Sequence, residues 1–285
     1  MQRQRSAAGQ AGTATCWLKS SYVAVFIRQL SEPIRNDGGG LGAASVEQHL
    51  VGLRSLFDWL VVGQVLPSNP VAAVRGTKRS LSTGKTPILE EDDAKWLLTS
   101  IAILKRDGTP DIVGLRDRVL IATMIDTFGR DSSVTGRCIG DDFPAPNGER
   151  YRVRPKEKNG RDHEMPAHDK LNEYLAQYLT EVPFASDAKR PLFPSSPGRG
   201  RGLTDRAMDR SAAYRMVRRR AKTAGIAIPI GNHSFRGSGI TNYLRNGGRV
   251  EEAQRMAAHA DPRTTKLYDR TGDEVSLDEV RRITI

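Results

Sequence analysis

The sequence predicts a mainly α-helical protein with one small antiparallel β-sheet, divided into two domains. Three observations lead to this prediction. Apolar residues recur at helical spacing in most segments of the 285-residue chain. One dipeptide, Asn159-Gly160, is of the kind that joins two antiparallel strands. Residues 75–87 are small or basic and nearly free of apolar side chains, which is typical of a linker between domains.

The first domain is expected over residues 17–74 and should be helical. Residues 1–16 are small and polar, so we expect a disordered start. A short helix is predicted from Tyr22 to Leu30. A longer amphipathic helix follows, because apolar residues keep a helical period from Val46 to Val61. The linker is then expected over residues 75–87.

The second domain is expected over residues 88–285. Apolar periodicity predicts helices at about 90–104 and 115–128. A strand is predicted from Tyr151 to Arg154, and its return strand at 164–166, on the far side of the Asn-Gly turn. The other segments are predicted to be helical, at about 169–181, 205–224, 233–245, 250–258, 263–268 and 277–283.

The charge balance points to an acidic partner. The net charge is +11, from 44 basic and 33 acidic residues, and the basic excess is spread over both domains. This distribution favours a polyanion such as nucleic acid that both domains hold, with a merely basic protein as the alternative. No run of eighteen apolar residues occurs, so we expect no membrane span. Two cysteines, Cys16 and Cys138, give no disulfide framework and suit a reducing compartment such as the cytoplasm.

The segment 231–270 carries most of the functional information. His233 and Arg236 are three residues apart at the start of a predicted helix, so they share one helical face. His259 follows Arg236 by 23 residues, and Tyr268 follows His259 by nine. Each of these residues alone is uninformative, but four residue types in this order and at these offsets form a specific pattern.

This pattern resembles the tyrosine recombinase, or phage integrase, family. Its signature is His-x-x-Arg, then a Gly-His-like step about two dozen residues later, then a tyrosine nine residues further on. Upstream, Thr-Phe-Gly-Arg-Asp-Ser-Ser resembles the family's Thr-Gly-Leu-Arg-x-Ser-Glu, which places Arg130 at the arginine position and Ser133 where glutamate is usual. Lys158 matches the family's hairpin lysine, with Lys156 as the competing assignment. The resemblance covers roughly residues 22–285.

The resemblance implies an enzyme that cuts and rejoins DNA at specific sites through a 3′-phosphotyrosine. Attack on a phosphodiester adds charge to its non-bridging oxygens, and arginine suits that charge because it is always ionised and presents a planar fork of donors. A phenol has a pKa near ~10 and gains from a proton acceptor; the leaving 5′-oxygen needs a proton. The implied nucleophile is Tyr268, the acceptor His233 and the general acid Lys158. The expected catalytic residues are Arg130, Lys158, His233, Arg236, His259 and Tyr268.

Double-stranded DNA is the expected partner, held by a homotetramer on two DNA sites, with accessory DNA-bending proteins as further partners. The resemblance implies that the helix around 210–224 approaches DNA, and a solvated basic face is the alternative. The expected DNA-binding residues are Arg215, Arg218, Arg219, Lys222, Lys78 and Arg79. We expect no cofactor and no metal, because His163 and His168 lack the other ligands of a metal site.

Two alternatives remain open at this stage. The first is a DNA-binding relative of the family that no longer recombines. Two features favour it: Ser133 replaces the usual glutamate, and residues 1–20 hold no amphipathic helix. A monomeric type IB topoisomerase-like enzyme would use the same chemistry. The target DNA site and the choice between integration, excision and resolution do not follow from the sequence.

Overall fold

The computed structural model describes residues 19–32, 40–76, 86–144, 151–153, 164–198, 202–269 and 281. The chain forms two compact units, Met1–Ser80 and Leu81–Ile285. The expected disordered start, most of the expected linker and the expected helix at 277–283 lie outside the described residues. Within the described part, no helix is both long enough and apolar enough to cross a membrane.

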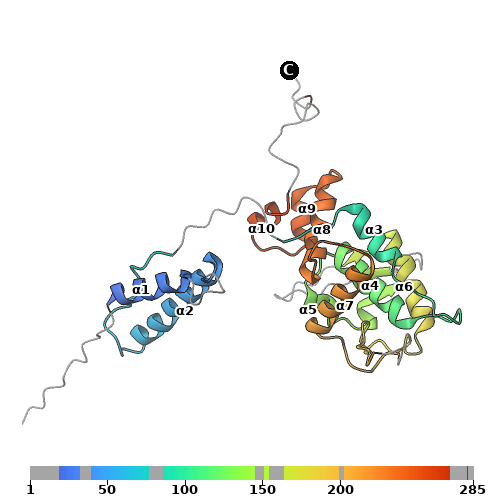
Figure 1. Ribbon diagram of the computed structural model, residues 1–285, viewed down its shortest axis with the longest axis horizontal. Helices are drawn as coiled ribbons and strands as arrows, with labels where there is room; N and C mark the ends of the chain where they lie inside the picture. The colour runs from blue at the N-terminus through green and yellow to red at the C-terminus, as the bar shows by residue number, and fades with distance from the viewer. Residues whose placement is uncertain are drawn as a thin grey trace, which may run out of the picture. The chain divides into compact units, whose positions relative to one another are not determined.

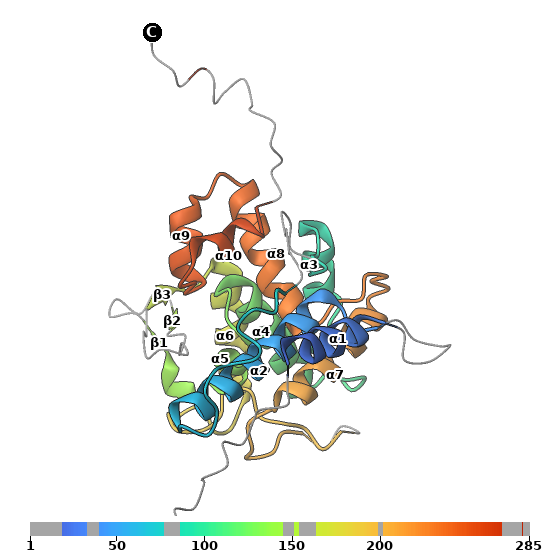
Figure 2. The same cartoon turned by 90° about the vertical axis from the view of Figure 1, so that its left-hand side faces the viewer.

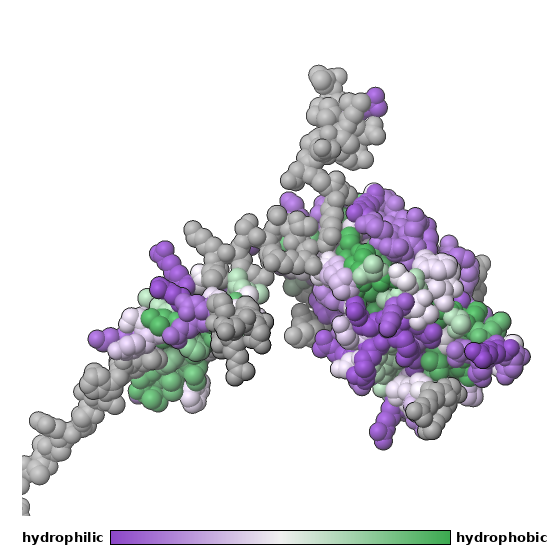
Figure 3. Space-filling model, in the orientation of Figure 1, coloured by the Kyte–Doolittle hydropathy of each residue, from purple (hydrophilic) through white to green (hydrophobic). Residues whose placement is uncertain are grey.

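The first unit contains two helices, α1 (Ser20–Ser31) and α2 (Ala43–Val62), which pack side by side (Figure 1). Both predicted helices are present, and α2 begins three residues before the predicted start. The small core between them is formed by Val23, Ile27, Val46, Leu50, Val71 and Val74. Apolar side chains also remain on the surface of this unit (Figure 3), where Trp59 is 69% and Val62 is 82% exposed.

The second unit is built around helix α4 (Ile112–Asp126). Every residue of α4 from Gly114 to Met124 is buried, as expected for a helix covered on all sides. Helices α6 (Asp169–Glu181) and α8 (Asn232–Arg245) pack against it, and α3 (Glu91–Thr99) contacts it as well (Figure 2). The elements α5 (Asp131–Thr135), η1 (Ile139–Asp141), α7 (Arg210–Thr223), α9 (Val250–Met256) and α10 (Pro262–Lys266) complete the helices.

Two helix boundaries differ from the prediction by five residues, and α5 was not predicted. Helix α3 ends at Thr99 rather than 104, because Leu104 pairs with Pro110 in an antiparallel β-bridge and so has extended rather than helical backbone. Helix α7 begins at 210 rather than 205. The Asp209 side chain accepts a hydrogen bond from the Ala212 backbone N–H at 2.7 Å, which caps the helix there.

The sheet is small and lies at one edge of the second unit. Its strands β1 (Asp142–Pro144), β2 (Tyr151–Val153) and β3 (Met165–Pro166) are antiparallel in the order β1-β2-β3. The predicted pair of strands is confirmed, with Val153 opposite Met165. The strand β1 was not predicted, and the Asn-Gly turn lies outside the described residues.

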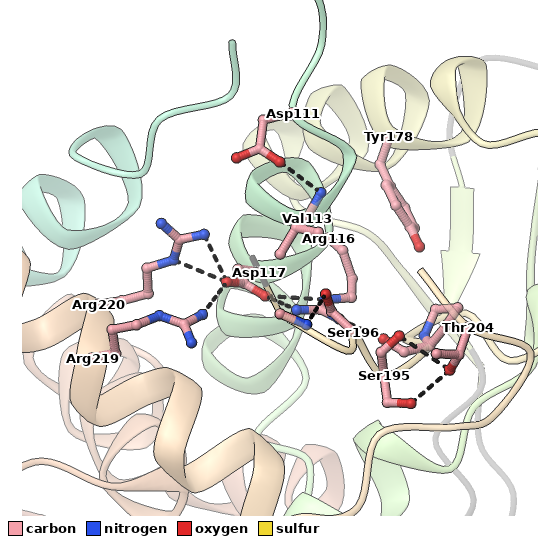
Figure 4. A network of polar contacts seen from close by, with 12 residues as sticks. Asp111, Val113, Arg116, Asp117, Tyr178, Ser195, Ser196, Thr204, Arg219 and Arg220 are labelled. Atoms are coloured by element: carbon pink, nitrogen blue, oxygen red, sulfur yellow. Dashed lines mark hydrogen bonds and ion pairs between the residues drawn. The ribbon is translucent and has the colours of Figure 1, made fainter. Parts of the chain in front are cut away.

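A buried ionic network joins α4 to α7 (Figure 4). Asp117 is fully buried, and one of its carboxylate oxygens accepts from Arg116 at 2.5 Å. The other oxygen lies 2.8 Å from Arg220 and 3.3 Å from Arg219, both on α7. Because an isolated buried carboxylate is costly, the contacts of Asp117 with three arginines, two of them on α7, hold α7 against α4. Arg116 also donates to the Pro194 carbonyl at 2.5 Å.

Two glycines let α8 approach its neighbours closely. A Cβ atom at Gly239 would collide with the Ile125 carbonyl at the end of α4 and would lie 2.8 Å from the Phe128 ring. A Cβ atom at Gly237 would lie 3.3 Å from the ring of Tyr268. The absence of side chains at these positions therefore brings α8 against the end of α4 and against Tyr268.

Candidate active site

The first turn of α8 presents the predicted His-x-x-Arg pair. His233 and Arg236 lie on one face, as their spacing predicts, but their environments differ. The His233 side chain is exposed to solvent, whereas Arg236 is only 2% exposed. The helix start is closed locally, because the Gly231 backbone N–H donates to the Ser234 hydroxyl at 3.1 Å.

The guanidinium of Arg236 is held by two backbone carbonyls from different parts of the chain. Nη1 donates to the Phe128 carbonyl and Nη2 donates to the Ala257 carbonyl at 2.6 Å. Phe128 follows α4 and has a left-handed backbone (φ 50°). Two carbonyls fix both the position and the plane of the guanidinium, so Arg236 is oriented before any ligand arrives.

Arg130 reaches the same place from the loop before α5. Its Nη2 donates a long hydrogen bond, 3.5 Å, to the carbonyl of Ala258. Ala258 directly follows the residue that holds Arg236, and it too has a left-handed backbone (φ 45°). The two arginines, more than a hundred residues apart in sequence, therefore meet at one short segment of backbone after α9.

Tyr268 lies just beyond α10 and is 7% exposed. Asp261 caps α10 by accepting from the Arg263 backbone N–H at 2.9 Å, with Pro262 in the first turn, as predicted. The Tyr268 hydroxyl lies 3.2 Å from Nε2 of His233. The Thr241 hydroxyl on α8 donates to the Tyr268 carbonyl at 2.9 Å, which ties the tyrosine backbone to the helix that carries His233.

His259 stands beside the tyrosine. Its ring is parallel to the Tyr268 ring, with 6.0 Å between centroids and 6° between planes. It is 8% exposed, and its Nδ1 lies 2.8 Å from the Thr265 hydroxyl on α10. Because Nδ1 is engaged, Nε2 is the nitrogen left to face a ligand.

Both histidines are shifted toward their neutral forms. The pKa of His233 lies below its usual 6.5, because the surrounding protein desolvates the ring and Arg236 repels a second positive charge. Burial lowers the pKa of His259 to about 3, and Arg236 and Arg130 add to the effect. Near neutral pH the positive charge of the site therefore resides on the arginines, and Nε2 of His233 can accept a proton.

The expected DNA-binding residues fall into different groups. Arg215 and Lys222 are exposed on α7. Arg218 is exposed but donates to the Ile230 carbonyl at 3.5 Å. Arg219, 60% exposed, pairs with buried Asp117, so part of its hydrogen-bonding capacity holds the fold together.

Several expectations fall outside the described residues. They concern the hairpin lysine and its competitor, the two basic linker residues and one histidine: Lys158, Lys156, Lys78, Arg79 and His163. The other histidine, His168, caps α6 by accepting from the Lys170 backbone N–H at 3.3 Å. In the described ranges, no group of three or more His, Cys, Asp or Glu residues lies in a metal-binding arrangement.

Sequence reasoning missed Asp131 and Thr265. Asp131 is the first residue of α5, and its carboxylate accepts from Nε of Arg210 at 3.2 Å. A signal for it existed, because Asp131 sits inside the upstream motif, next to Arg130, in a chain where the motif's usual glutamate is Ser133. Thr265 carries no motif signal.

A cavity of about 1100 Å³ lies behind the site, between α3, α4, α6, α8 and α9. Phe128, whose carbonyl holds Arg236, lines this cavity. Met256 lines it as well and directly precedes Ala257, whose carbonyl also holds Arg236. Its lining is mainly apolar, but Asp126 also borders it. Burial raises the pKa of the Asp126 carboxyl to about 6.

Residues 89–274 match the model of the phage integrase family. Among known proteins, the tyrosine recombinase XerD of Listeria innocua is 27% identical over 233 residues, which cover 80% of this chain and 72% of that protein. The tyrosine recombinase XerC of Escherichia coli O157:H7 is 28% identical over 239 residues, covering 82% of this chain and 72% of that one.

Solved structures share the fold at lower identity. The XerH site-specific recombinase bound to its difH substrate, in a pre-cleavage complex, matches with a TM-score of 0.64 at 18% identity, over 93% of this chain and 70% of that one. A lambda integrase tetramer bound to a Holliday junction matches with a TM-score of 0.63 at 14% identity, over 91% of this chain and 68% of that one.

Proposed function

The chain belongs to the phage integrase family of tyrosine recombinases, which cut and rejoin DNA strands, and we propose that Tyr268 is its nucleophile. One observation carries this proposal. The Tyr268 hydroxyl lies 3.2 Å from a neutral histidine nitrogen, within a cluster that also holds Arg130, Arg236 and His259. A buried phenol beside a proton acceptor and two fixed cations suits attack on an anionic phosphodiester.

In the cleavage step, the Tyr268 oxygen forms a bond to the scissile phosphorus and its proton passes to Nε2 of His233. The two arginines take up the charge that develops on the non-bridging oxygens, and each such group is worth about 2.7–4 kcal/mol of barrier where it has been measured in other enzymes. His259 donates a hydrogen bond from Nε2 to one of these oxygens. It does so as a neutral ring, because its pKa is about 3.

The bond from phosphorus to the 5′-oxygen breaks in the same step. That oxygen needs a proton, and we assign its donation to Lys158, with Lys156 as the competing assignment. The products are a 3′-phosphotyrosine and a free 5′-hydroxyl. Attack by the 5′-hydroxyl of a partner strand reverses the step and frees the tyrosine, so the phosphoester energy is conserved and no ATP is required.

We assign DNA contacts to the exposed face of α7 through Arg215, Arg218 and Lys222, and to the basic linker through Lys78 and Arg79. These cations would contact phosphates and so contribute affinity rather than sequence selectivity. Arg219 contributes with its exposed part while it remains paired with Asp117.

We further propose a homotetramer on two DNA sites, assisted by DNA-bending proteins, in the bacterial cytoplasm. The fold shared with a lambda integrase tetramer on a Holliday junction supports this assembly. We also predict from the sequence that Leu277, Val280 and Ile283 form the apolar stripe of a short helix, which would need a surface to dock on. That surface is either its own domain or a neighbouring subunit, and we propose the neighbour. Deletion of 275–285 should then weaken synapsis of two sites while single-site binding persists.

Covalent trapping tests the nucleophile. A DNA duplex that carries the native site, nicked so that the cleaved fragment diffuses away, should accumulate a covalent protein–DNA complex. The Tyr268→Phe variant should bind the same duplex with nearly unchanged affinity and form no covalent complex. Covalent complex with the Phe variant would show that another residue attacks.

The same substrate separates the alternatives. A DNA-binding relative without activity would bind but never trap, and the substitution of Ser133 at the usual glutamate position favours this reading. A monomeric topoisomerase-like enzyme would trap and relax DNA but would not transfer strands between two sites. Strand transfer identifies the recombinase.

A further inference from the structure

We propose that the cavity between α3, α4, α6, α8 and α9 is a binding site for a small apolar molecule that carries one ammonium group. The Asp126 carboxylate is the partner of the ammonium, and the walls at Phe128 and Met256 connect the bound molecule to Arg236. Neither DNA nor Tyr268 takes part in this binding, so the site is independent of the proposed function.

The cavity has the size and the walls of a site for a small organic molecule. Its volume is about 1100 Å³, slightly above the range of about 300–1000 Å³ that is usual for ligand pockets. Apolar side chains form most of the lining, among them Ala94 and Leu98 of α3, Ile125 of α4 and Met256 of α9. A ligand with a hydrocarbon or aromatic body is therefore favoured, because binding removes these walls and the ligand's own surface from water.

The charges around the cavity leave one carboxylate unmatched. Each Lys, Arg and Glu side chain of the lining belongs to an ion pair: Glu91–Lys95, Glu164–Arg152, Lys170–Glu173 and Glu252–Arg255. Within the described ranges, no hydrogen bond or ion pair reaches the carboxylate of Asp126, whose electrostatic neighbour is the exposed ring of His168. The cavity therefore presents a single free acidic group to whatever enters it.

This acidic group and the aromatic rings beside it select a cation. Burial raises the pKa of the Asp126 carboxyl to about 6, so near neutral pH the group is largely ionised although it is poorly hydrated. An ammonium that reaches it forms a charge-assisted hydrogen bond, which is stronger than a bond between neutral groups. The rings of Phe128, Tyr174 and Tyr243 also line the cavity, and the faces of aromatic rings attract cations. An anionic ligand meets repulsion from the same carboxylate.

The walls of the cavity are continuous with the groups that hold Arg236. The Phe128 ring packs edge-on against the Tyr243 ring, with 6.1 Å between centroids, and the Phe128 carbonyl accepts from Nη1 of Arg236. Met256 directly precedes Ala257, whose carbonyl accepts from Nη2 at 2.6 Å. A molecule that contacts Phe128 and Met256 therefore changes the surroundings of both carbonyls, and the guanidinium senses whether the cavity is filled.

Calorimetric titration of the full chain without DNA tests the ligand class. The probe is 4-phenylbutylamine, which should bind at neutral pH with a Kd of about 1 mM or tighter. The matched probes 4-phenylbutanol and 4-phenylbutyrate keep the apolar body but lack the cation, so each should bind at least about tenfold more weakly. Absence of saturable binding of the amine, or equal affinity for the amine and the carboxylate, overturns the proposal.

Variants locate the site. Asp126→Asn should weaken binding of the amine by about tenfold or more and leave the affinity for the alcohol within about twofold. Asp92→Asn is the matched control, because it neutralises an exposed carboxylate of α3 that does not line the cavity, and it should leave both affinities unchanged. If Asp126→Asn does not fold, Ala94→Phe carries the test, since the added ring fills the cavity and should abolish binding of both probes. Unchanged affinity for the amine in either variant overturns the proposal.

The connection to the active site has its own readout. The Nε–Hε resonance of Arg236, assigned by its loss in Arg236→Lys, should shift on saturation with the amine. The shift should persist in Asp92→Asn and be absent in Asp126→Asn at the same probe concentration. A resonance that does not move in the saturated, unmodified chain overturns the connection between the cavity and Arg236.

The C-terminal tail is the competing occupant, because its sequence combines apolar residues with two cations, Arg281 and Arg282. Deletion of residues 275–285 should leave the affinity for the amine unchanged. An affinity that rises by about tenfold or more on deletion would show that the tail fills the cavity, and it would overturn the assignment to a free ligand. None of these titrations requires cleavage, so they stand or fail whether or not Tyr268 is the nucleophile, which the trapping experiment decides.

Discussion

Neutralising the buried carboxylate of Asp117 should strongly destabilise the second unit. Asp117 is fully buried and contacts three guanidinium groups, one of which, on Arg116, is only 2% exposed. The variant Asp117→Asn keeps the size of the side chain but leaves these cations without their anion. Removal of one partner of a buried ion pair costs about 3–5 kcal/mol, because the remaining charge cannot regain its hydration.

The melting temperature converts this cost into an observable. For a unit of this size each kcal/mol corresponds to about 2–4 °C, so the melting temperature should fall by roughly 6–20 °C. Arg219→Ala is the control on the other side of the network. Its guanidinium is 60% exposed, and loss of such a pair should cost about 1 kcal/mol or less.

Urea unfolding followed by circular dichroism measures both variants. If Asp117→Asn unfolds within about 1 kcal/mol of the unmodified chain, the network does not hold α7 on α4 as its burial indicates. If Arg219→Ala lowers the free energy of unfolding as much as Asp117→Asn does, the exposed pair between Arg219 and Asp117 contributes most of the stability.

Three further predictions follow from backbone, charge and DNA contact. Ala258 has a left-handed backbone, which costs an L-residue about 1–2 kcal/mol, and the greater freedom of glycine in the unfolded chain offsets about 0.4–1 kcal/mol of the relief. Ala258→Gly should therefore raise the free energy of unfolding in urea titrations by up to about 1.5 kcal/mol, and a loss of stability would contradict the strain. His259 has a folded-state pKa of about 3, far below its unfolded value of 6.5, so the unfolded chain binds the proton first and the free energy of unfolding should fall as the pH drops from 6.5 toward 3. This fall should be shallower in His259→Gln, and the same dependence of the free energy of unfolding on pH in both proteins would refute the assignment. Affinity for duplex DNA should fall by roughly three orders of magnitude between about 50 and about 200 mM salt, because many phosphate contacts release counterions; a flat profile in a filter-binding or anisotropy titration would rule out a basic clamp.

Local patterns in the sequence were sufficient for most of the fold and for the candidate nucleophile. Apolar periodicity predicted α1, α2, α4, α6 and α8 close to their observed bounds, because apolar residues recur at every third or fourth position on the side of a helix that packs against the protein. The paired strands β2 and β3 followed from one turn signal. The spacing of His233, His259 and Tyr268 predicted a cluster, and the structure brings these three side chains together.

Boundaries were less predictable than elements. Helix α5 was missed because five residues are too few for a periodic signal. The start of α7 depends on a cap at Asp209 and on an extended segment that pairs with a distant loop. Such ends are set by individual hydrogen bonds, which a hydrophobic pattern does not record.

Only the tertiary structure decided which arginines are bonded to groups within the protein and which remain available to a ligand. Arg215 and Arg219 are the same residue type one helical turn apart and both are exposed, yet Arg219 is also paired with buried Asp117, about a hundred residues away in sequence. Arg236 likewise finds its two carbonyls only when α4 and α9 have packed against α8. The sequence by itself determined the residue types, their periodicity and their spacing, because these act within a few turns of chain. The partners of each charge were determined by packing between distant segments, because burial and Coulomb energies depend on distances in space.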